Sequence, residues 1–150
     1  MLAGRMTSAA VHFLDWAAAK LNSQPERGPR HLQTGRRGEE AAYFYLRRQG
    51  YVMVARNFRS PRRRGEIDLI GWDKKTLCFI EVKTRTTRDV KPAEAAVDRD
   101  KWRELTAVAG EYLRHLPPAC DWRFDLVSVY YDVPSGQSLL ELFKNAHPVA

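Results

Sequence analysis

Two acidic residues in the middle of the chain, Asp68 and Glu81, have a spacing that suits a metal site. They lie in the segment G-E-I-D-L-I-G-W-D-K-K-T-L-C-F-I-E-V-K-T-R, residues 65–85, in which two apolar runs flank a short polar stretch. This pattern predicts two strands joined as a β-hairpin. If the loop closes symmetrically, Asp68 lies opposite Glu81, and Glu66 lies opposite Lys83.

The predicted hairpin gathers like charges on one face. Facing residues hold their Cβ atoms roughly 4.5–5.5 Å apart, and like charges placed there destabilise a sheet. Side chains alternate along a strand, so one face carries Glu66, Asp68, Glu81 and Lys83, and the other carries Ile67, Leu69, Ile80 and Val82. A hard ion such as Mg²⁺ or Mn²⁺ binds one or two carboxylates together with water and phosphate oxygens, and this face offers them. A Glu66–Lys83 pair alone would contribute about 0–1 kcal/mol and would leave the facing carboxylates unexplained.

A predicted helix precedes the hairpin and carries a third candidate ligand, Glu39. The helix spans residues 35–49, with Ala42 and Leu46 on its apolar stripe and Gly50 placed to end it. Glu39 falls on the same stripe, where a carboxylate costs several kcal/mol unless it is paired or coordinated. The alternative is a glutamate near the helix start, favoured by the helix dipole by about 0.3–1 kcal/mol.

The other elements follow from the spacing of apolar residues. Strands are predicted over 51–58, 122–131 and 139–143, and an amphipathic helix that opens at Lys91-Pro92 ends at Pro117-Pro118. The order αβββαββ predicts an α/β domain. Within the 122–131 strand, Arg123 and Asp125 are interpreted as a pair that fastens the sheet edge, in preference to a catalytic pair.

The chain of 150 residues is expected to hold one domain, over 35–150, after an N-terminal extension over 1–34. The extension is predicted to contain a short amphipathic helix and a polar linker. Packing on the domain, partner binding and contact with a membrane surface all remain open for that helix. No membrane span or signal peptide is recognisable, and Cys78 and Cys120 lack metal-ligand spacing, so a cytoplasmic protein with free thiols is expected.

The charge of the chain favours a polyanionic partner. The net charge is +7, and basic residues crowd the segments before and after the acidic hairpin. A basic rim around an acidic centre suits a phosphodiester that is first attracted and then held on a metal. The candidate phosphate contacts are Arg36, Arg37, Arg62, Arg63, Arg64, Arg85 and Lys101, and the alternative for each is a solvated surface charge.

Four sequence blocks carry a resemblance to a known family. They are G-R-R-G-E-E-A-A at 35–42, G-E-I-D-L-I at 65–70, F-I-E-V-K-T-R at 79–85 and R-F-D-L-V at 123–127. The pattern of an aspartate followed by E-V-K resembles the PD-(D/E)XK metal-dependent nucleases. The four blocks together resemble, more narrowly, the YraN family of small bacterial proteins. The resemblance implies a restriction endonuclease-like core, αβββαβ with an extra C-terminal strand, in which helices flank a mixed central sheet. This core is similar to that of Holliday junction resolvases.

The same resemblance implies Mg²⁺- or Mn²⁺-dependent hydrolysis of phosphodiester bonds in DNA, which is favoured over RNA, and in branched or structured DNA in particular. Asp68 and Glu81 would hold the metal with the backbone carbonyl of Val82, and Glu39 would serve a second metal or the outer shell. Lys83 would orient the attacking water or stabilise charge in the transition state. Similarity to resolvases also implies a homodimer.

Two other functions fit the same sequence. One is a nucleic-acid-binding module that keeps the fold without catalysis, for which salt-sensitive DNA binding without cleavage is expected. The other is a scaffold or partner-binding protein recruited through its N-terminal helix.

Overall fold

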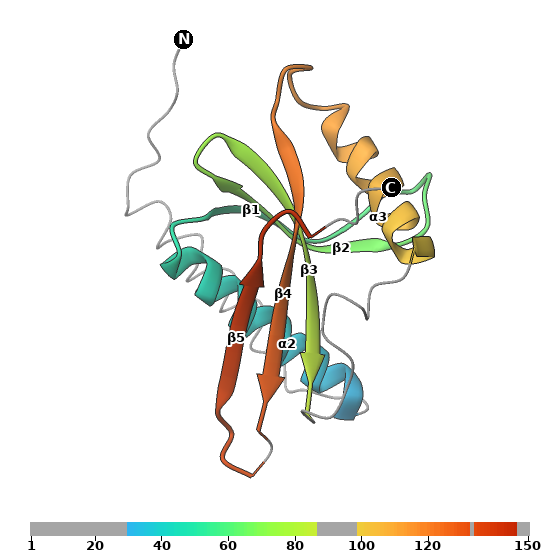
Figure 1. Ribbon diagram of the computed structural model, residues 1–150. Coiled ribbons are helices and arrows are strands. Elements are labelled where there is room, and N and C mark those ends of the chain that lie inside the picture. The colour runs from blue at the N-terminus through green and yellow to red at the C-terminus, as the bar shows by residue number, and fades with distance from the viewer. Residues whose placement is uncertain (1–29, 87–98, 133, 147–150) are drawn as a thin grey trace. The chain divides into compact units, whose positions relative to one another are not determined.

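The protein is an α/β structure whose five strands form a single mixed sheet with two helices (Figure 1). The computed structural model describes residues 30–86, 99–132 and 134–146, and those from Thr34 onward form one compact unit. The elements are α2 (Arg30–Arg48), β1 (Val52–Arg59), β2 (Glu66–Asp73), β3 (Thr76–Arg85), α3 (Arg99–Leu113), β4 (Trp122–Tyr131) and β5 (Ser138–Phe143). This order confirms the predicted αβββαββ sequence of elements.

The sheet has its strands in sequence order, from β1 to β5. Strands β3 and β4 are parallel and the other three pairs are antiparallel. The parallel pair requires a crossover, which contains α3. Strand β3 is therefore the centre of the sheet, and its residues from Leu77 to Val82 are all buried.

Each face of the sheet carries its own apolar cluster. Leu77 and Phe79 of β3 pack with Trp102 and Leu105 of α3. Cys78, Ile80 and Val82, which alternate with them, pack with Ala42 and Leu46 of α2. The two helices therefore cover opposite faces, as can be followed in Figure 1. None of the described helices is long and apolar enough to cross a membrane.

The two clusters correct the prediction that the hairpin has one apolar face. Ile70 and Phe79 are buried on the face that also carries Glu81, because a helix covers both sides of an interior strand. Ile67 packs with the α3 cluster, whereas Leu69 packs with the α2 cluster. This change of side falls where the pairing of β2 with β3 ends, at Leu69 opposite Ile80.

Both helices have boundaries that differ from the prediction. Helix α2 begins at Arg30, so part of the predicted linker is helical, and Arg36 and Arg37 lie inside the helix instead of at its start. Helix α3 ends at Leu113, before Pro117-Pro118. A residue that precedes a proline disfavours the helical conformation, so the helix ends before Pro117. After Leu113 the chain continues in 3₁₀-type turns, with bonds such as that from the His115 N–H to the Tyr112 carbonyl. The predicted start at Lys91-Pro92 and the predicted N-terminal helix lie outside the described residues.

A second ion-pair network, largely buried, centres on Arg123 of β4 and reaches Asp73 at the end of β2. The Arg123 Nε atom donates to Asp125 Oδ1 at 2.8 Å, and Arg123 Nη2 donates to Asp73 Oδ2 at 2.7 Å. Asp125, fully buried, also accepts bonds from the Tyr51 hydroxyl at 2.9 Å and from the Asn145 N–H at 3.0 Å. The predicted Arg–Asp pair is confirmed, but it lies on an interior strand and not at the sheet edge, because β5 adds outside β4.

Candidate metal centre

Asp68 and Glu81 lie just beyond the last pair of the β2–β3 ladder, close enough for their charges to interact. The pairs from Leu69 opposite Ile80 to Asp73 opposite Thr76 follow the symmetric closure that the sequence predicts. One step further, the Val82 N–H donates to Asp68 Oδ2 at 2.8 Å. The Asp68 side chain therefore reaches across to the backbone of β3, next to Glu81.

Glu81 is a buried carboxylate with one oxygen left open. Its side chain is only 5% exposed. Its Oε1 atom lies 3.3 Å from Lys83 Nζ and 3.8 Å from Lys101 Nζ. Its Oε2 atom is buried and has no hydrogen-bond donor among the described residues. A buried polar atom without a partner costs about 1–3 kcal/mol or more when charged, so this oxygen is suited to a ligand that supplies positive charge.

The environment of Asp68 also disfavours a second negative charge beside Glu81. Burial raises the pKa of Asp68 to about 8, helped by the negative charges of Glu81 and Glu39, while the Val82 N–H and Lys101 oppose the rise. Burial is the largest cause of this rise and repulsion from Glu81 is the second, so two negative charges are costly in this environment. A divalent cation between Asp68 and Glu81 would relieve this repulsion.

Glu39 and Glu66 are connected through Asn57, a residue that the sequence did not single out. Asn57 Nδ2 donates to Glu39 Oε2 at 3.0 Å and to Glu66 Oε1 at 2.8 Å. Arg59 binds the second oxygen of Glu66. The pairing of Glu66 with Lys83 is therefore wrong: Glu66 faces Arg59 in the ladder with β1, and Lys83 turns to Glu81.

Asn57 has an unusual backbone for a strand residue. Its φ angle is +49°, and it lies between the pairs Arg56 opposite Leu69 and Phe58 opposite Ile67, level with Asp68. Left-handed residues other than glycine are uncommon, and such strain gathers at functional sites. The signal in the sequence is an asparagine within a strand pattern, since asparagine is depleted in strands but tolerates this conformation.

Helix α2 approaches β3 closely enough to bring Glu39 near the centre. Gly38 is buried, and a Cβ atom added to it would lie 1.8 Å from Thr84 Oγ1 and 2.9 Å from Thr84 Cβ. Any larger residue would therefore force the helix away from the strand. The glycine before Glu39 thus sets the position of that carboxylate.

The lysines of the centre come from two elements. Lys83 lies on β3, as predicted, and Lys101 reaches Glu81 from the first turn of α3. Lys101 had been expected to contact phosphate, and its place within the centre follows from the packing of α3 on the sheet. Val82 lies between Glu81 and Lys83, and its carbonyl stays a predicted ligand.

The predicted phosphate contacts fall into two groups. Exposed side chains are those of Arg36 and Arg37 on α2 and of Arg62, Arg63 and Arg64 in the loop after β1. Arg63 Nε lies 3.7 Å from Glu111 Oε1. Arg85 is half-buried at the end of β3, which makes it less accessible to a strand of nucleic acid than the loop arginines are.

The donor set suits an open site for a hard cation. In the part of the chain that the structure describes, no three histidine, cysteine or acidic side chains converge closely enough to enclose a metal by themselves. Structural zinc needs four such ligands, whereas Mg²⁺ takes one or two carboxylates and keeps several waters. Asp68 and the open oxygen of Glu81 fit Mg²⁺ or Mn²⁺. Cys78 and Cys120 are free thiols, as predicted.

The raised pKa of Asp68 predicts how stability depends on pH without divalent ions. Between the ordinary pKa of 3.8 and the folded value of about 8, the folded protein keeps a proton that the unfolded chain has released. The free energy of unfolding should therefore fall as the pH rises from about 5 to about 8. Asp68→Asn should flatten this slope and gain about 1–2 kcal/mol relative to wild type on going to pH 8. Urea denaturation in EDTA at both pH values measures this difference, and an equal slope in both proteins would contradict it.

Comparison with known proteins places the chain in a family. A family model described as "Uncharacterised protein family UPF0102" matches residues 38–129. A UPF0102 protein of Koribacter versatilis (strain Ellin345) is 54% identical over 131 residues, which cover 87% of this chain and 88% of the relative. One of Solibacter usitatus is 49% identical over 63% of this chain and 73% of the relative, and one of Desulfosudis oleivorans is 41% identical over 76% and 89%. Both the blocks that carry the predicted resemblance and the extent of these matches lead to one conclusion: the chain belongs to the UPF0102 family, the YraN family.

Proposed function

We propose that the protein is a Mg²⁺- or Mn²⁺-dependent nuclease that hydrolyses phosphodiester bonds in DNA. The observation that carries the proposal is the buried Glu81 Oε2 atom, which has no hydrogen-bond donor among the described residues and belongs to a carboxylate next to Asp68. The mixed sheet between two helices supports it further, because it agrees with the restriction endonuclease-like core that the sequence blocks imply. Branched or structured DNA is the favoured substrate.

Each residue of the centre has a role in this proposal. Asp68 and Glu81 would hold the metal, with the Val82 carbonyl as a further ligand. The metal, when bound, lowers the pKa of its water and offsets the charge of the scissile phosphate. Lys83 lies 3.3 Å from Glu81 Oε1. It would orient the attacking water or stabilise charge on the phosphate. Glu39, held by Asn57, would serve the outer shell or a second metal.

The surroundings of the centre provide the expected attraction for a nucleic acid. The net charge is +7, and Arg62, Arg63 and Arg64 are exposed in the loop that leads into β2. Phosphate contacts of this kind give affinity that falls as salt concentration rises. A cytoplasmic location and a homodimer that acts on two symmetric strands belong to the same proposal.

One observation favours a second candidate, a nucleic-acid-binding module without catalysis. Lys83 and Lys101 both lie within 4 Å of Glu81 Oε1, so part of the negative charge is neutralised without a metal. In such a module the lysines would replace the cation. A scaffold role through the N-terminal extension concerns residues outside those described.

The deciding experiment is incubation of the purified protein with linear, nicked, flap and four-way DNAs and an RNA control. Each reaction contains Mg²⁺, Mn²⁺ or EDTA. We expect cleavage of at least one DNA with either metal and none in EDTA. DNA binding that weakens with salt, without cleavage under any metal, would refute the nuclease and support the second candidate.

A further inference from the structure

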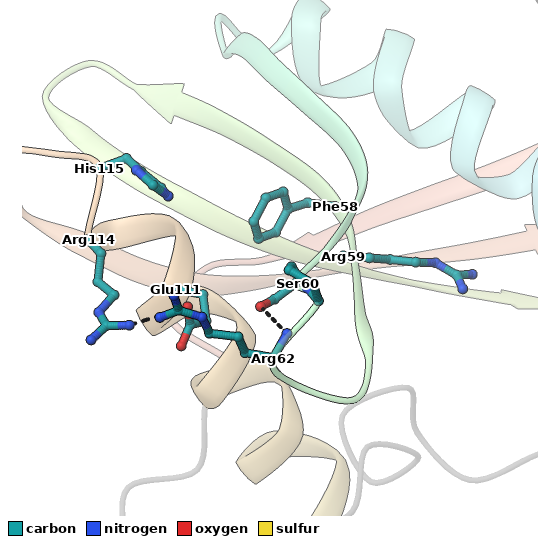
Figure 2. Close-up of a pocket in the computed structure, with 8 residues that line it drawn as sticks. Phe58, Arg59, Ser60, Arg62, Glu111, Arg114 and His115 are labelled. Atoms are coloured by element: carbon teal, nitrogen blue, oxygen red, sulfur yellow. Dashed lines mark hydrogen bonds and ion pairs between the residues drawn. The ribbon is translucent and has the colours of Figure 1, made fainter.

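A surface pocket of about 330 Å³ lies between the end of β1 and the end of α3 (Figure 2). One wall consists of the last β1 residues and the loop that follows, and the other of the end of α3 and the residues after it. Its lining residues are Phe58, Arg59, Ser60, Pro61, Arg62, Glu111, Arg114 and His115. A volume of this size is at the lower end of those that take small molecules or single groups of larger ones.

The pocket is electropositive although it contains a carboxylate. Both oxygens of Glu111 lie near arginines, with Oε1 3.7 Å from Arg63 and Oε2 3.6 Å from Arg114. The side chains of Arg62 and His115 have no partner among the described residues. The acid is therefore neutralised, and donors on opposite walls remain available for an anion.

Ser60 adds a buried donor to the same pocket. The residue is 8% exposed, and its Oγ atom accepts a bond from the Arg62 N–H at 3.1 Å. Figure 2 shows this hydroxyl on the side of Arg62 and Glu111. The hydroxyl proton has no acceptor among the described residues. This proton is available to an anion in the pocket.

One residue of the pocket lining, Arg59, also contacts a carboxylate outside the pocket. This residue lines the pocket and binds Glu66, which shares Asn57 with Glu39. These contacts end at Glu39. The pocket itself lies at the other end of α3 from Lys101, about 15 Å along the helix at 1.5 Å per residue.

We propose that this pocket binds a terminal phosphate of a nucleic-acid strand. The inference rests on the proposed function only in taking nucleic acid as the ligand. A phosphomonoester carries a charge of about −1.5 to −2 at neutral pH and three acceptor oxygens. Ser60 and Arg62 offer donors from one wall and His115 offers one from the other, which suits the three oxygens of this group better than the two free oxygens of an internal phosphodiester.

The test compares strand ends in a binding assay. Fluorescent single-stranded oligonucleotides of one sequence, with 5′-phosphate, 3′-phosphate or only hydroxyl ends, are titrated in EDTA and followed by anisotropy. Wild type should bind one phosphorylated form about tenfold tighter than the hydroxyl form, because hydrogen bonds to a charged group are stronger than those to a neutral hydroxyl. The variant Arg62→Gln with His115→Gln should lose this ratio. Ser60→Ala should reduce it.

The matched control is Arg64→Gln, which removes an exposed arginine from the same loop but not from the pocket. It should keep the ratio while weakening all three oligonucleotides alike. The proposal is overturned if wild type binds phosphorylated and hydroxyl ends equally well. It is also overturned if the double variant keeps the preference for phosphorylated ends, or if Arg64→Gln loses that preference to the same extent. Inorganic phosphate that protects wild type from heat as well as the phosphorylated strand does would overturn it too, because the pocket would then be a free-anion site.

The assay separates this inference from the nuclease. Binding is measured without divalent ions, so no cleavage is needed for the end preference to appear. A protein that prefers phosphorylated ends and never cleaves would refute the nuclease alone. A protein that cleaves with Mn²⁺ and ignores end phosphates would refute the pocket alone.

Discussion

Replacing Glu81 by glutamine should slow metal-dependent phosphodiester cleavage by a factor of about a thousand. Glutamine keeps the size of the side chain but removes the charge next to Asp68, and a metal contributes several kcal/mol to stabilising charge in the transition state. The open Glu81 Oε2 atom would become part of a neutral amide. Binding of Mn²⁺, measured by calorimetry, should weaken in parallel with the cleavage rate.

The control for this prediction is Glu141→Gln, the same chemical change at an exposed position on β5. That variant should cleave and bind Mn²⁺ like wild type. Circular dichroism must show that Glu81→Gln is folded before its rate is interpreted. Equal cleavage by wild type and a folded Glu81→Gln protein would remove this carboxylate from the mechanism.

The largest loss of stability is expected from Asp125→Ala. The carboxylate is fully buried and accepts bonds from Tyr51, Arg123 and the Asn145 N–H. Its removal leaves the Arg123 guanidinium partly buried, with Asp73 as its remaining acidic partner among the described residues. Breaking a buried pair in this way costs about 3–5 kcal/mol, a large share of the stability of a domain.

Urea denaturation followed by circular dichroism measures this loss. The matched variant is Asp121→Ala, an exposed aspartate just before β4, which should change the free energy of unfolding by less than about 0.5 kcal/mol. An Asp125→Ala protein as stable as Asp121→Ala would show that the network contributes nothing to the fold.

Local patterns were enough to predict the hairpin and its register. Alternating apolar residues on either side of a short polar turn identified both strands, and symmetric closure gave the pairs from Leu69 opposite Ile80 to Asp73 opposite Thr76. The predicted pairs of Asp68 with Glu81 and of Glu66 with Lys83 lie beyond the end of that ladder. The order of elements followed from the same periodicities. These features depend on residues close together in the sequence, where geometry leaves few choices.

Features that depend on distant packing were not predicted. Lys101 enters the centre because α3 packs on the sheet, and Glu66 turns to Arg59 because β1 lies beside β2. Asn57 bridges Glu39 and Glu66, and it does so from a left-handed backbone conformation within a strand. Ile67 and Leu69 lie two residues apart but join different clusters, which strict alternation does not allow.

The central position of β3 has a consequence for how the protein folds. Its pairing with β2 is local, whereas its parallel partner β4 is synthesised only after α3. Contacts between distant segments form slowly because a long loop must close first. During translation, therefore, Asp68, Glu81 and Lys83 can meet in the nascent hairpin before Lys101 has emerged from the ribosome, so Lys83 is the first of the two lysines to offset the charge of Glu81.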